Sequence, residues 1–131
     1  MAGAAGFGGK AGVGAAIAYN GIDNDIKSEM ENVTSLKHTG NVAINAAGDN
    51  MIISVTGAVG VATGGGGEKG YGVGGTLAIN NISNTIEAGI KDSTTTTDST
   101  GDVSLLARDS SYVISVSGGF AYGKTAGLGL A

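Results

Sequence analysis

Large and small residues alternate along much of the chain with a period of two. Between residues 13 and 20, Val13, Ile17 and Tyr19 occupy odd positions, and small residues or Asn occupy the even ones. The same phase returns at 73–80, where Val, Leu and Ile again stand at odd positions. This period is typical of a β-strand with one buried face. We therefore expect strands here, with the row of large residues facing the interior.

A sharper alternation of apolar and charged residues follows at 26–31. Ile26 and Met30 share one face with Ser28, and charged residues stand at the positions between and after them. The pattern recurs at 86–91. Because charged side chains ordinarily face water, we expect the apolar row to lie inside and the charged row outside.

Two further strands are expected in each half of the chain. A short one at 42–44 is echoed at 103–105, and a long one at 51–62 is echoed at 112–122. Clusters of Asn, Asp and Gly at 20–21, 23–25, 48–50 and 64–67 predict turns between strands, since these residues tolerate positive φ or hydrogen-bond the local backbone. Helix signals are lacking, because Gly interrupts every Ala-rich patch.

The whole pattern occurs twice. The sequence GVG at 12–14 returns at 72–74, an offset of 72 − 12 = 60, and ISV at 53–55 returns at 114–116, an offset of 114 − 53 = 61. Repetition of this length predicts a stacked, quasi-one-dimensional architecture. Four strand segments in each unit of about 60 residues suggest two or three coils, since coils of this kind commonly need about 20 to 30 residues.

The predicted fold is all-β: a single β-solenoid, or parallel β-helix, over residues 1–131. Repeat one covers 12–71, and a truncated repeat two covers 72–131. Because 124–129 resembles the start of each repeat, we expect the chain to be a segment of a longer array. Stacked long β-hairpins are the alternative, since the two arms of 51–80 flank a Gly-rich break and also fit an antiparallel hairpin.

Stacking places like residues on like. Asn20 then lies over Asn80, and Asn24 over Asn84. We expect these pairs to form the rungs of structural amide ladders at the corners of the coils. Turn geometry alone is a second explanation for their shared register.

The composition fits this architecture better than a conventional globular core. Gly accounts for 26 of 131 residues, Pro is absent, and 41% of residues are hydrophobic, which favours ordered β-structure over a flexible linker. Only 5% are aromatic and Trp is absent. A narrow interior lined by Ala, Val, Ile and Leu is therefore expected.

The charge and the missing residue types exclude several kinds of function. The formal net charge is −4, and no basic patch is present, so nucleic acid is not an expected partner. With no Cys, disulfides and thiolate metal sites are excluded. The single histidine, His38, has no partner for a zinc site or a catalytic triad, and we expect it in an exposed loop.

One acidic cluster is the candidate for a metal site. Asp23, Asp25, Glu29 and Glu31 supply the hard oxygen ligands that Ca²⁺ prefers. Repeat two replaces them with Ser, Thr, Gly and Lys, and their outward row favours a solvated acidic face. We therefore expect no cofactor, with these four residues as a weak Ca²⁺ candidate.

No catalytic constellation stands out. The acidic residues are close in sequence and lack a supporting Arg, so a glycosidase-like or lyase-like carboxylate pair is not expected, and neither is an enzyme. The Gly-rich stretch at 64–74 lacks the Gly-Lys-Ser/Thr of a phosphate-binding loop. The Thr run at 94–97 predicts a polar loop.

The repeated segments resemble a known group of bacterial proteins. Residues 12–24 look like the recurring unit GVGAAVAYNxIxN of very large secreted or surface proteins of the filamentous haemagglutinin, leukotoxin and autotransporter-adhesin type. The second copy at 72–84 is similar, with GTL at 75–77 in place of the small-residue run. The phrases at 40–44 and 101–105 resemble GDVxVxA coils of the same proteins.

This resemblance implies a β-solenoid passenger segment of a long surface filament, and it brings no catalytic residues. We expect a structural stalk of a secreted or cell-surface adhesin or toxin, anchored to the outer membrane through the parent protein, with neighbouring repeats as its partners. End-to-end self-association is also expected, because an array of this kind ends in open sheet edges. The alternative is a module that binds a host glycan or protein through an outward face or the 92–100 loop.

Overall fold

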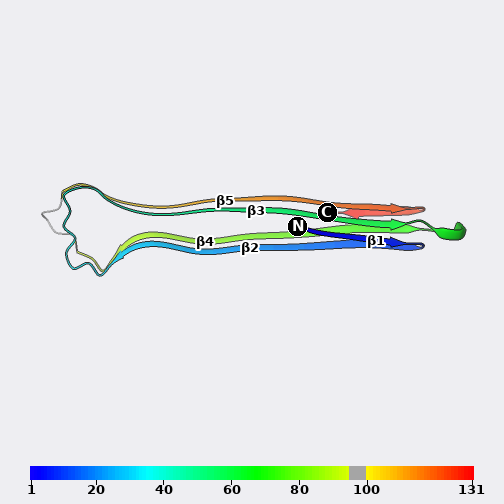
Figure 1. Cartoon of the computed structure of the whole chain (residues 1–131), viewed down its shortest axis with the longest axis horizontal. Helices are drawn as coiled ribbons and strands as arrows, with labels where there is room; N and C mark the ends of the chain where they lie inside the picture. The colour runs from blue at the N-terminus through cyan, green and yellow to red at the C-terminus, as the bar shows by residue number, and fades with distance from the viewer. Residues whose placement is uncertain (95–99) are drawn as a thin grey trace. The chain divides into compact units, whose positions relative to one another are not determined.

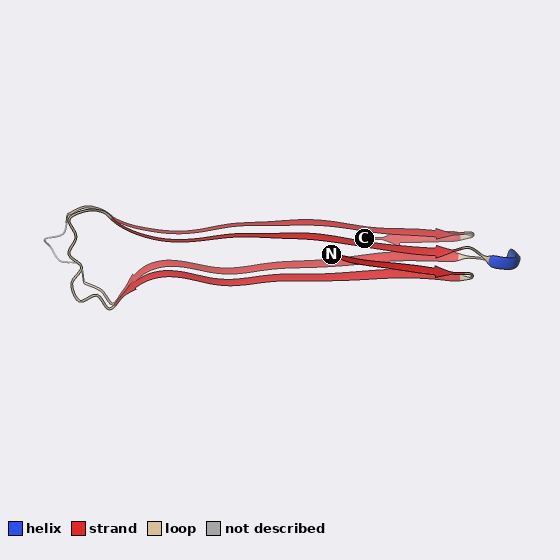
Figure 2. Cartoon of the chain, viewed as in Figure 1, coloured by secondary structure: helices blue, strands red, loops and turns tan. Residues whose placement is uncertain are grey.

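The computed structural model describes residues 1–94 and 100–131, and these are mostly β-strand (Figures 1 and 2). A short 3-10 helix, η1 (Gly65–Gly67), lies between two of the strands. The strands in chain order are β1 (Ala2–Gly8), β2 (Ala11–Glu31), β3 (Val42–Ala62), β4 (Tyr71–Lys91), β5 (Val103–Gly123) and β6 (Ala126–Leu130). The prediction of an all-β fold is confirmed.

The strands form two three-stranded sheets, and successive strands alternate between them. Sheet A has the order β1-β3-β5, and sheet B has the order β2-β4-β6. β1 runs parallel to β3, and β4 runs parallel to β6, with Tyr71 opposite Ala126. Figure 1 shows β3 beside β5 and β2 beside β4. Because β3 and β4 belong to different sheets, residues 51–80 form no hydrogen-bonded hairpin, and the alternative of stacked hairpins is wrong.

The strands are fewer and longer than the sequence predicts. β2, β3, β4 and β5 each contain 21 residues, so one repeat contributes one strand to each sheet. The turns predicted at 20–21, 23–25 and 48–50 lie inside β2 and β3. Asn20 hydrogen-bonds to Asn80 on β4 of the same sheet and Asn24 to Asn50 on β3 of the other sheet, and these contacts support an extended backbone in place of a turn. One repeat therefore makes a single pass through both sheets, and not two or three coils.

Residues in the left-handed region mark where two of the long strands end. Asn32 follows β2 with φ of 55°, and Asp92 follows β4 with φ of 47°. Asn and Asp tolerate this conformation better than most residues because their short polar side chains hydrogen-bond locally. The two positions are 60 residues apart in the sequence, so both repeats leave sheet B in the same way.

The chain divides into two compact units, and each unit combines segments of both repeats. Unit 1 contains Met1–Gly21, Met51–Asn81 and Val113–Ala131, and unit 2 contains Ile22–Asn50 and Ile82–Tyr112. The units therefore do not coincide with the repeats at 12–71 and 72–131.

Unit 1 has mostly small residues inside and large residues outside. On β2 the side chains of Val13, Ile17 and Tyr19 are 63%, 70% and 70% exposed, while the residues between them are mostly buried. Tyr122 on β5 is 56% exposed. The expectation that the large row faces the interior is wrong for this unit. The buried row consists of Gly12, Gly14, Ala16 and Ala18 on β2, of Ile52, Ser54, Thr56, Ala58, Gly60 and Ala62 on β3, and of Gly72 and Gly74 on β4.

The reason for this inversion is the close approach of the two sheets. A Cβ atom added at Gly12 would fall on the carbonyl oxygen of Val61, and one added at Gly60 would fall on that of Val73. Sheets that pack through ordinary side chains lie about 10 Å apart and have no such conflict. Because glycine and other small residues are what fit at these close contacts, the period of two places their large neighbours on the outer surface. Ile52, near the start of the unit's β3 segment, is a large residue that is nonetheless buried.

Unit 2 follows the predicted pattern. Ile26 on β2 is partly buried, while Lys27 and Glu31 are exposed. At Gly48 on β3, an added Cβ would lie 2.6 Å from Cδ1 of Ile86 and 3.3 Å from Cδ1 of Ile26. Large apolar side chains therefore fill the space between the sheets in this unit, and Gly48 leaves room for two of them.

We predict that Gly60→Ala and Gly57→Ala have opposite effects on stability. The Cβ at position 60 collides with the backbone of the other sheet, so the free energy of unfolding should fall by about 3 kcal/mol. The Cβ at position 57 meets nothing within 4 Å, and Ala is favoured over Gly in a strand, so stability should rise by about 0.5 kcal/mol. Guanidinium unfolding of both variants checks this, and equal losses at the two positions would contradict the close approach of the sheets.

Candidate functional site

The inward Asn residues of β2 and β4 are in direct contact in unit 1. The Nδ2 atom of Asn20 donates to Oδ1 of Asn80 at 2.8 Å. The same Nδ2 atom donates to Oγ of Ser54, on β3, at 3.2 Å. One amide group therefore joins the two repeats along sheet B and also crosses to sheet A.

A larger polar network forms inside unit 2. Nδ2 of Asn24 donates to Oδ1 of Asn50 at 2.6 Å and to Oδ1 of Asn84 at 3.4 Å. Nδ2 of Asn84 in turn donates to both carboxylate oxygens of Asp109, at 3.1 and 3.0 Å, and to Oγ of Ser111 at 3.0 Å. Ser111 donates its hydroxyl to Asp109 at 2.7 Å. Four strands therefore contribute to one network.

The Asp109 carboxyl is stabilised in its charged form. The amide of Asn84 and then the hydroxyl of Ser111 donate to it, and these hydrogen bonds hold its pKa below the ordinary value for Asp. With the offset of 61, Asp109 takes the place that Gly48 has in the first repeat. Position 48 has little room for a side chain beside Ile26 and Ile86, whereas Asp109 is exposed on the outermost long strand of sheet A.

The structure brings each predicted ladder pair together, but not at corners. Asn20, Asn24, Asn80 and Asn84 all lie within the long strands β2 and β4. Sequence reasoning missed their partners Asn50, Asp109, Ser111 and Ser54. The signal that could have found them is the alternation along each strand, because every partner stands at a position whose side chain points between the sheets. At Asn50 the prediction of a turn over 48–50 hides this alternation.

The four candidate Ca²⁺ ligands do not converge. Asp23, Asp25, Glu29 and Glu31 all have odd numbers on β2 and share one face, so about 27 Å of strand separates the first from the last. Asp25 lies 3.5 Å from Nζ of Lys27, in an ion pair. Across residues 1–94 and 100–131, no three acidic or histidine side chains are grouped so that they would hold a metal ion.

An ion-pair ladder occupies this outer face instead. Lys91 on β4 forms an ion pair and a hydrogen bond with Glu29 on β2, and it lies 3.8 Å from Glu87. Lys27 lies 3.6 Å from the same Glu87. The hydrogen bond from Lys91 lowers the pKa of Glu29, and the same bond raises the pKa of Lys91. Two lysines and two glutamates thus neutralise one another across the strands of sheet B.

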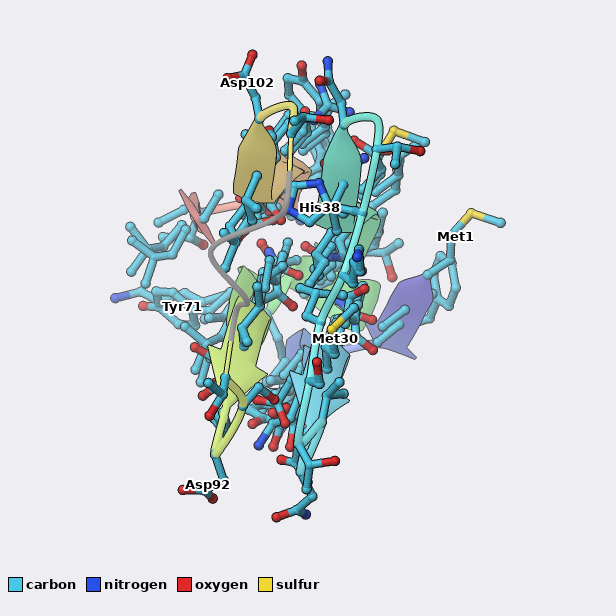
Figure 3. The ribbon with its side chains drawn as sticks, turned by 90° about the vertical axis from the view of Figure 1, so that its left-hand side faces the viewer. Met1, Met30, His38, Tyr71, Asp92 and Asp102 are labelled. Carbon is cyan, nitrogen blue, oxygen red and sulfur yellow. The ribbon has the colours of Figure 1, made fainter. Side chains whose placement is uncertain are left out.

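Among the described residues, the other sequence candidates form no site. Nδ1 of His38 lies 2.7 Å from the carbonyl oxygen of Gly40, in the connection between β2 and β3. In the Gly-rich stretch, Glu68 pairs with Lys10 at 2.9 Å, and β4 follows in place of the helix that a phosphate-binding loop requires. Of the 92–100 loop and the Thr run at 94–97, residues 95–99 lie outside the described residues (Figure 1). Figure 3 shows Tyr71 projecting outward from β4, where it is 46% exposed.

Comparisons with known proteins do not identify the chain. No family model, no curated protein and no solved structure matches it. Within the described part of the chain, no helix has the length and apolar character needed to cross a lipid bilayer. The function therefore has to be inferred from the contacts themselves.

Two inward hydroxyl groups in unit 1 are buried without a hydrogen-bond partner. They are Oγ1 of Thr56, on β3, and Oγ1 of Thr76, on β4. Thr56 is only 3% exposed, so its hydroxyl has lost its hydrogen bonds to water without forming one within the protein. The neighbouring inward Ser54 accepts a hydrogen bond from Asn20 and offers a matched comparison.

We predict that Thr56→Val stabilises the protein and that Ser54→Ala destabilises it. Valine keeps the branched shape and removes an unsatisfied polar group, which should raise the free energy of unfolding by about 1 kcal/mol. Alanine at position 54 removes an acceptor of Asn20 and should lower it by about 1 kcal/mol. Thermal and chemical unfolding of the two variants give the comparison, and a loss of stability in Thr56→Val would show that its hydroxyl has a partner.

We predict that Asn84→Ala returns the pKa of Asp109 toward about 3.9, the ordinary value for Asp. A carboxyl with a lowered pKa contributes stability above its unfolded-state pKa, and this contribution is lost as the pH falls through the lower, folded-state pKa. The variant should therefore lose less stability on acidification than the wild type. Carbon-13 NMR titration of the Asp109 carboxyl measures the shift directly. Asn80→Ala, which removes an amide of the same row without contact to Asp109, should leave that titration unchanged.

Proposed function

We propose that the chain is a β-solenoid segment with one coil per repeat, and that it serves as a structural stalk or passenger region of a large bacterial secreted or surface adhesin or toxin. The observation that carries this proposal is the direct contact of identical side chains 60 residues apart: Asn20 with Asn80, and Asn24 with Asn84. What the repetition supplies is therefore an interface between repeats, and not a duplicated pocket.

The path of the chain supports a solenoid. Successive strands alternate between two sheets, and the paired strands within a sheet run parallel. A chain that winds in one direction follows this path. The two short strands, β1 and β6, extend the same stack on either side of the four long strands. Ala2–Gly8 lies in register with residues 56–62, and Ala126–Leu130 lies in register with residues 71–75.

The size of one coil determines how tall a stack of repeats can be. Each repeat adds one strand to each sheet, so a stack grows by about 4.8 Å for every 60 residues. A stack 100 Å tall would then need about 20 repeats. We propose a broad scaffold whose long strands present extended outer faces, and whose partners are the neighbouring repeats of the parent protein.

A host-binding module receives less support. The outward residues Lys27 and Glu29, which the binding hypothesis would use, are already paired with Glu87 and Lys91. A ligand would have to compete with these ion pairs. The assignment to bacterial secretion or to the cell surface rests on the resemblance of residues 12–24 and 72–84, and end-to-end association through the open edges of the sheets follows from the stacked geometry.

We predict that stability depends on the number of repeats. Chains with two, three and four copies of the 60-residue repeat should unfold in one transition whose guanidinium midpoint rises with each copy, because every added coil contributes one more interface. Midpoints that do not change with copy number would show that the repeats are independent modules and would contradict the proposal.

The control is a matched series in which Asn24 and its equivalent Asn84 are replaced by Asp in every copy. Asp has nearly the shape of Asn, but stacked carboxylates repel each other. The rise in midpoint should therefore shrink at neutral pH and recover below about pH 4, where the carboxyls become protonated.

A further inference from the structure

The outer face of sheet A in unit 1 is apolar and uncovered. Phe7 on β1 is 76% exposed, Ile53 on β3 is 57% exposed, and Phe120 on β5 is 61% exposed. Val55 and Val116 on the same face are 41% and 58% exposed. The outward positions of the three strands carry no charged residue within this unit. We call this surface the sheet A face.

This face is large enough to form an interface. From Met51 to Ala62, β3 extends for about 40 Å, and three strands side by side are about 14 Å wide, which gives a footprint of about 500 Å². Soluble monomers rarely leave a larger contiguous apolar patch uncovered. Two such faces packed together would remove about 1,000 Å² from water, which is the lower limit for a biological interface and fits a weak dimer.

The face contains both a groove and a ridge. The groove has a volume of about 650 Å³, and two outward residues of each strand line it, of which one is always glycine: Gly3, Gly57 and Gly118. The backbone at Gly57 and at Gly118 does not have positive φ, and an added Cβ at either position meets nothing within 4 Å. The fold of the single chain therefore does not require glycine at these two positions.

The ridge lies beside the groove on the same strand. Phe120 follows Gly118 by two residues, or about 7 Å, and it is among the residues that line the groove. A two-fold axis between the two residues would place Phe120 of one copy over Gly118 of a second copy, and the reverse. Because the same surface contains the glycine groove and the protruding Phe120, it is complementary to the same surface of a second copy.

We propose that two copies of this chain associate in solution through their sheet A faces, with Phe120 of each copy seated in the glycine groove of the other. The sheets then pack face to face, as in a β-sandwich. The absence of charge on the face favours a second copy over a charged lipid headgroup or an acidic peptide. The dimer does not depend on the proposed stalk function, since it uses the sheet faces and not the strand edges.

The outer face of sheet B is the natural comparison. Ile17, on β2, is 70% exposed and lies in unit 1. The depression beside it has a volume of about 270 Å³, less than half that of the groove in the sheet A face, and Ile17 and Leu77 flank it in place of an aromatic ring. This face therefore supplies a control surface of similar hydrophobicity and poorer fit.

The test is sedimentation velocity of the full chain from about 1 to 100 µM, a range that brackets micromolar association. The wild type should pass from monomer to a closed dimer. Ile53→Lys places a charge in the centre of the sheet A face and should weaken the dimer by about 30-fold or more, because the charge would have to be desolvated. Ile17→Lys, the same change on the outer face of sheet B, should leave dimerisation within about twofold of the wild type.

A second variant tests the groove without adding charge. Gly57→Val fills the groove, and its Cβ has open space in the single chain, so the variant should fold normally and dimerise about tenfold more weakly. Circular dichroism and guanidinium unfolding confirm that each variant is folded.

Four results would overturn the proposal. They are a wild-type chain that stays monomeric throughout, equal losses in Ile53→Lys and Ile17→Lys, an open-ended series of oligomers that Ile53→Lys does not change, and a monomer that binds vesicles of uncharged phosphatidylcholine through this face. The third result would assign self-association to the strand edges alone. The repeat-number series described above is independent of all four, so the two proposals can fail separately.

Discussion

The close approach of two backbones determines most of what is distinctive in unit 1. Where a Cβ atom at Gly12 or Gly60 would meet the carbonyl oxygen of the facing strand, the interior consists of main chain and of the smallest side chains. Packing of this kind depends on many short van der Waals contacts, and a large apolar group has no room at these glycine positions. Because a strand has only two faces, each large residue that cannot enter must stand outside. The apolar outer surface is thus a consequence of the interior.

In unit 2, larger side chains fill the space between the two sheets. There Ile26 and Ile86 reach between the sheets toward Gly48, and amides and a carboxylate satisfy one another beside them. Its outer face on sheet B carries ion pairs such as Lys91 with Glu29. Because the apolar side chains of this unit lie between the sheets, the outward positions are occupied by charged side chains. Both units therefore obey one rule, since the size of the inward residues determines the character of the outward ones.

This rule also explains how much the sequence predicts. The period of two and the offset of 60 residues predict the all-β fold and the pairing of Asn20 with Asn80, because both depend on parity and repetition alone. They do not tell which parity faces inward, since alternation of Val13 and Gly14 is the same pattern seen from either side, and the answer depends on the distance to the facing sheet. Turn propensity fails at Asn24 and Asn50 because contacts between strands outweigh local preference. Comparison of the two repeats does not single out Asp109, because the equivalent residue in repeat one is Gly48, which has no side chain that could form the same hydrogen bonds.

The outward row of unit 1 raises the question of what kept it apolar. Ile53 and Val55 of repeat one face the same side as Ile114 and Val116 of repeat two, and both repeats place glycine next in the row. The acidic positions of β2, in contrast, differ between the repeats. A surface that only had to face water would tolerate polar residues in one repeat or the other, since an exposed strand position imposes little packing constraint. That both copies have apolar residues and the same glycine argues that this face is covered in the working protein. The chain thus has two stacking directions: along the sheets through its amide ladders, and across them through its outer face.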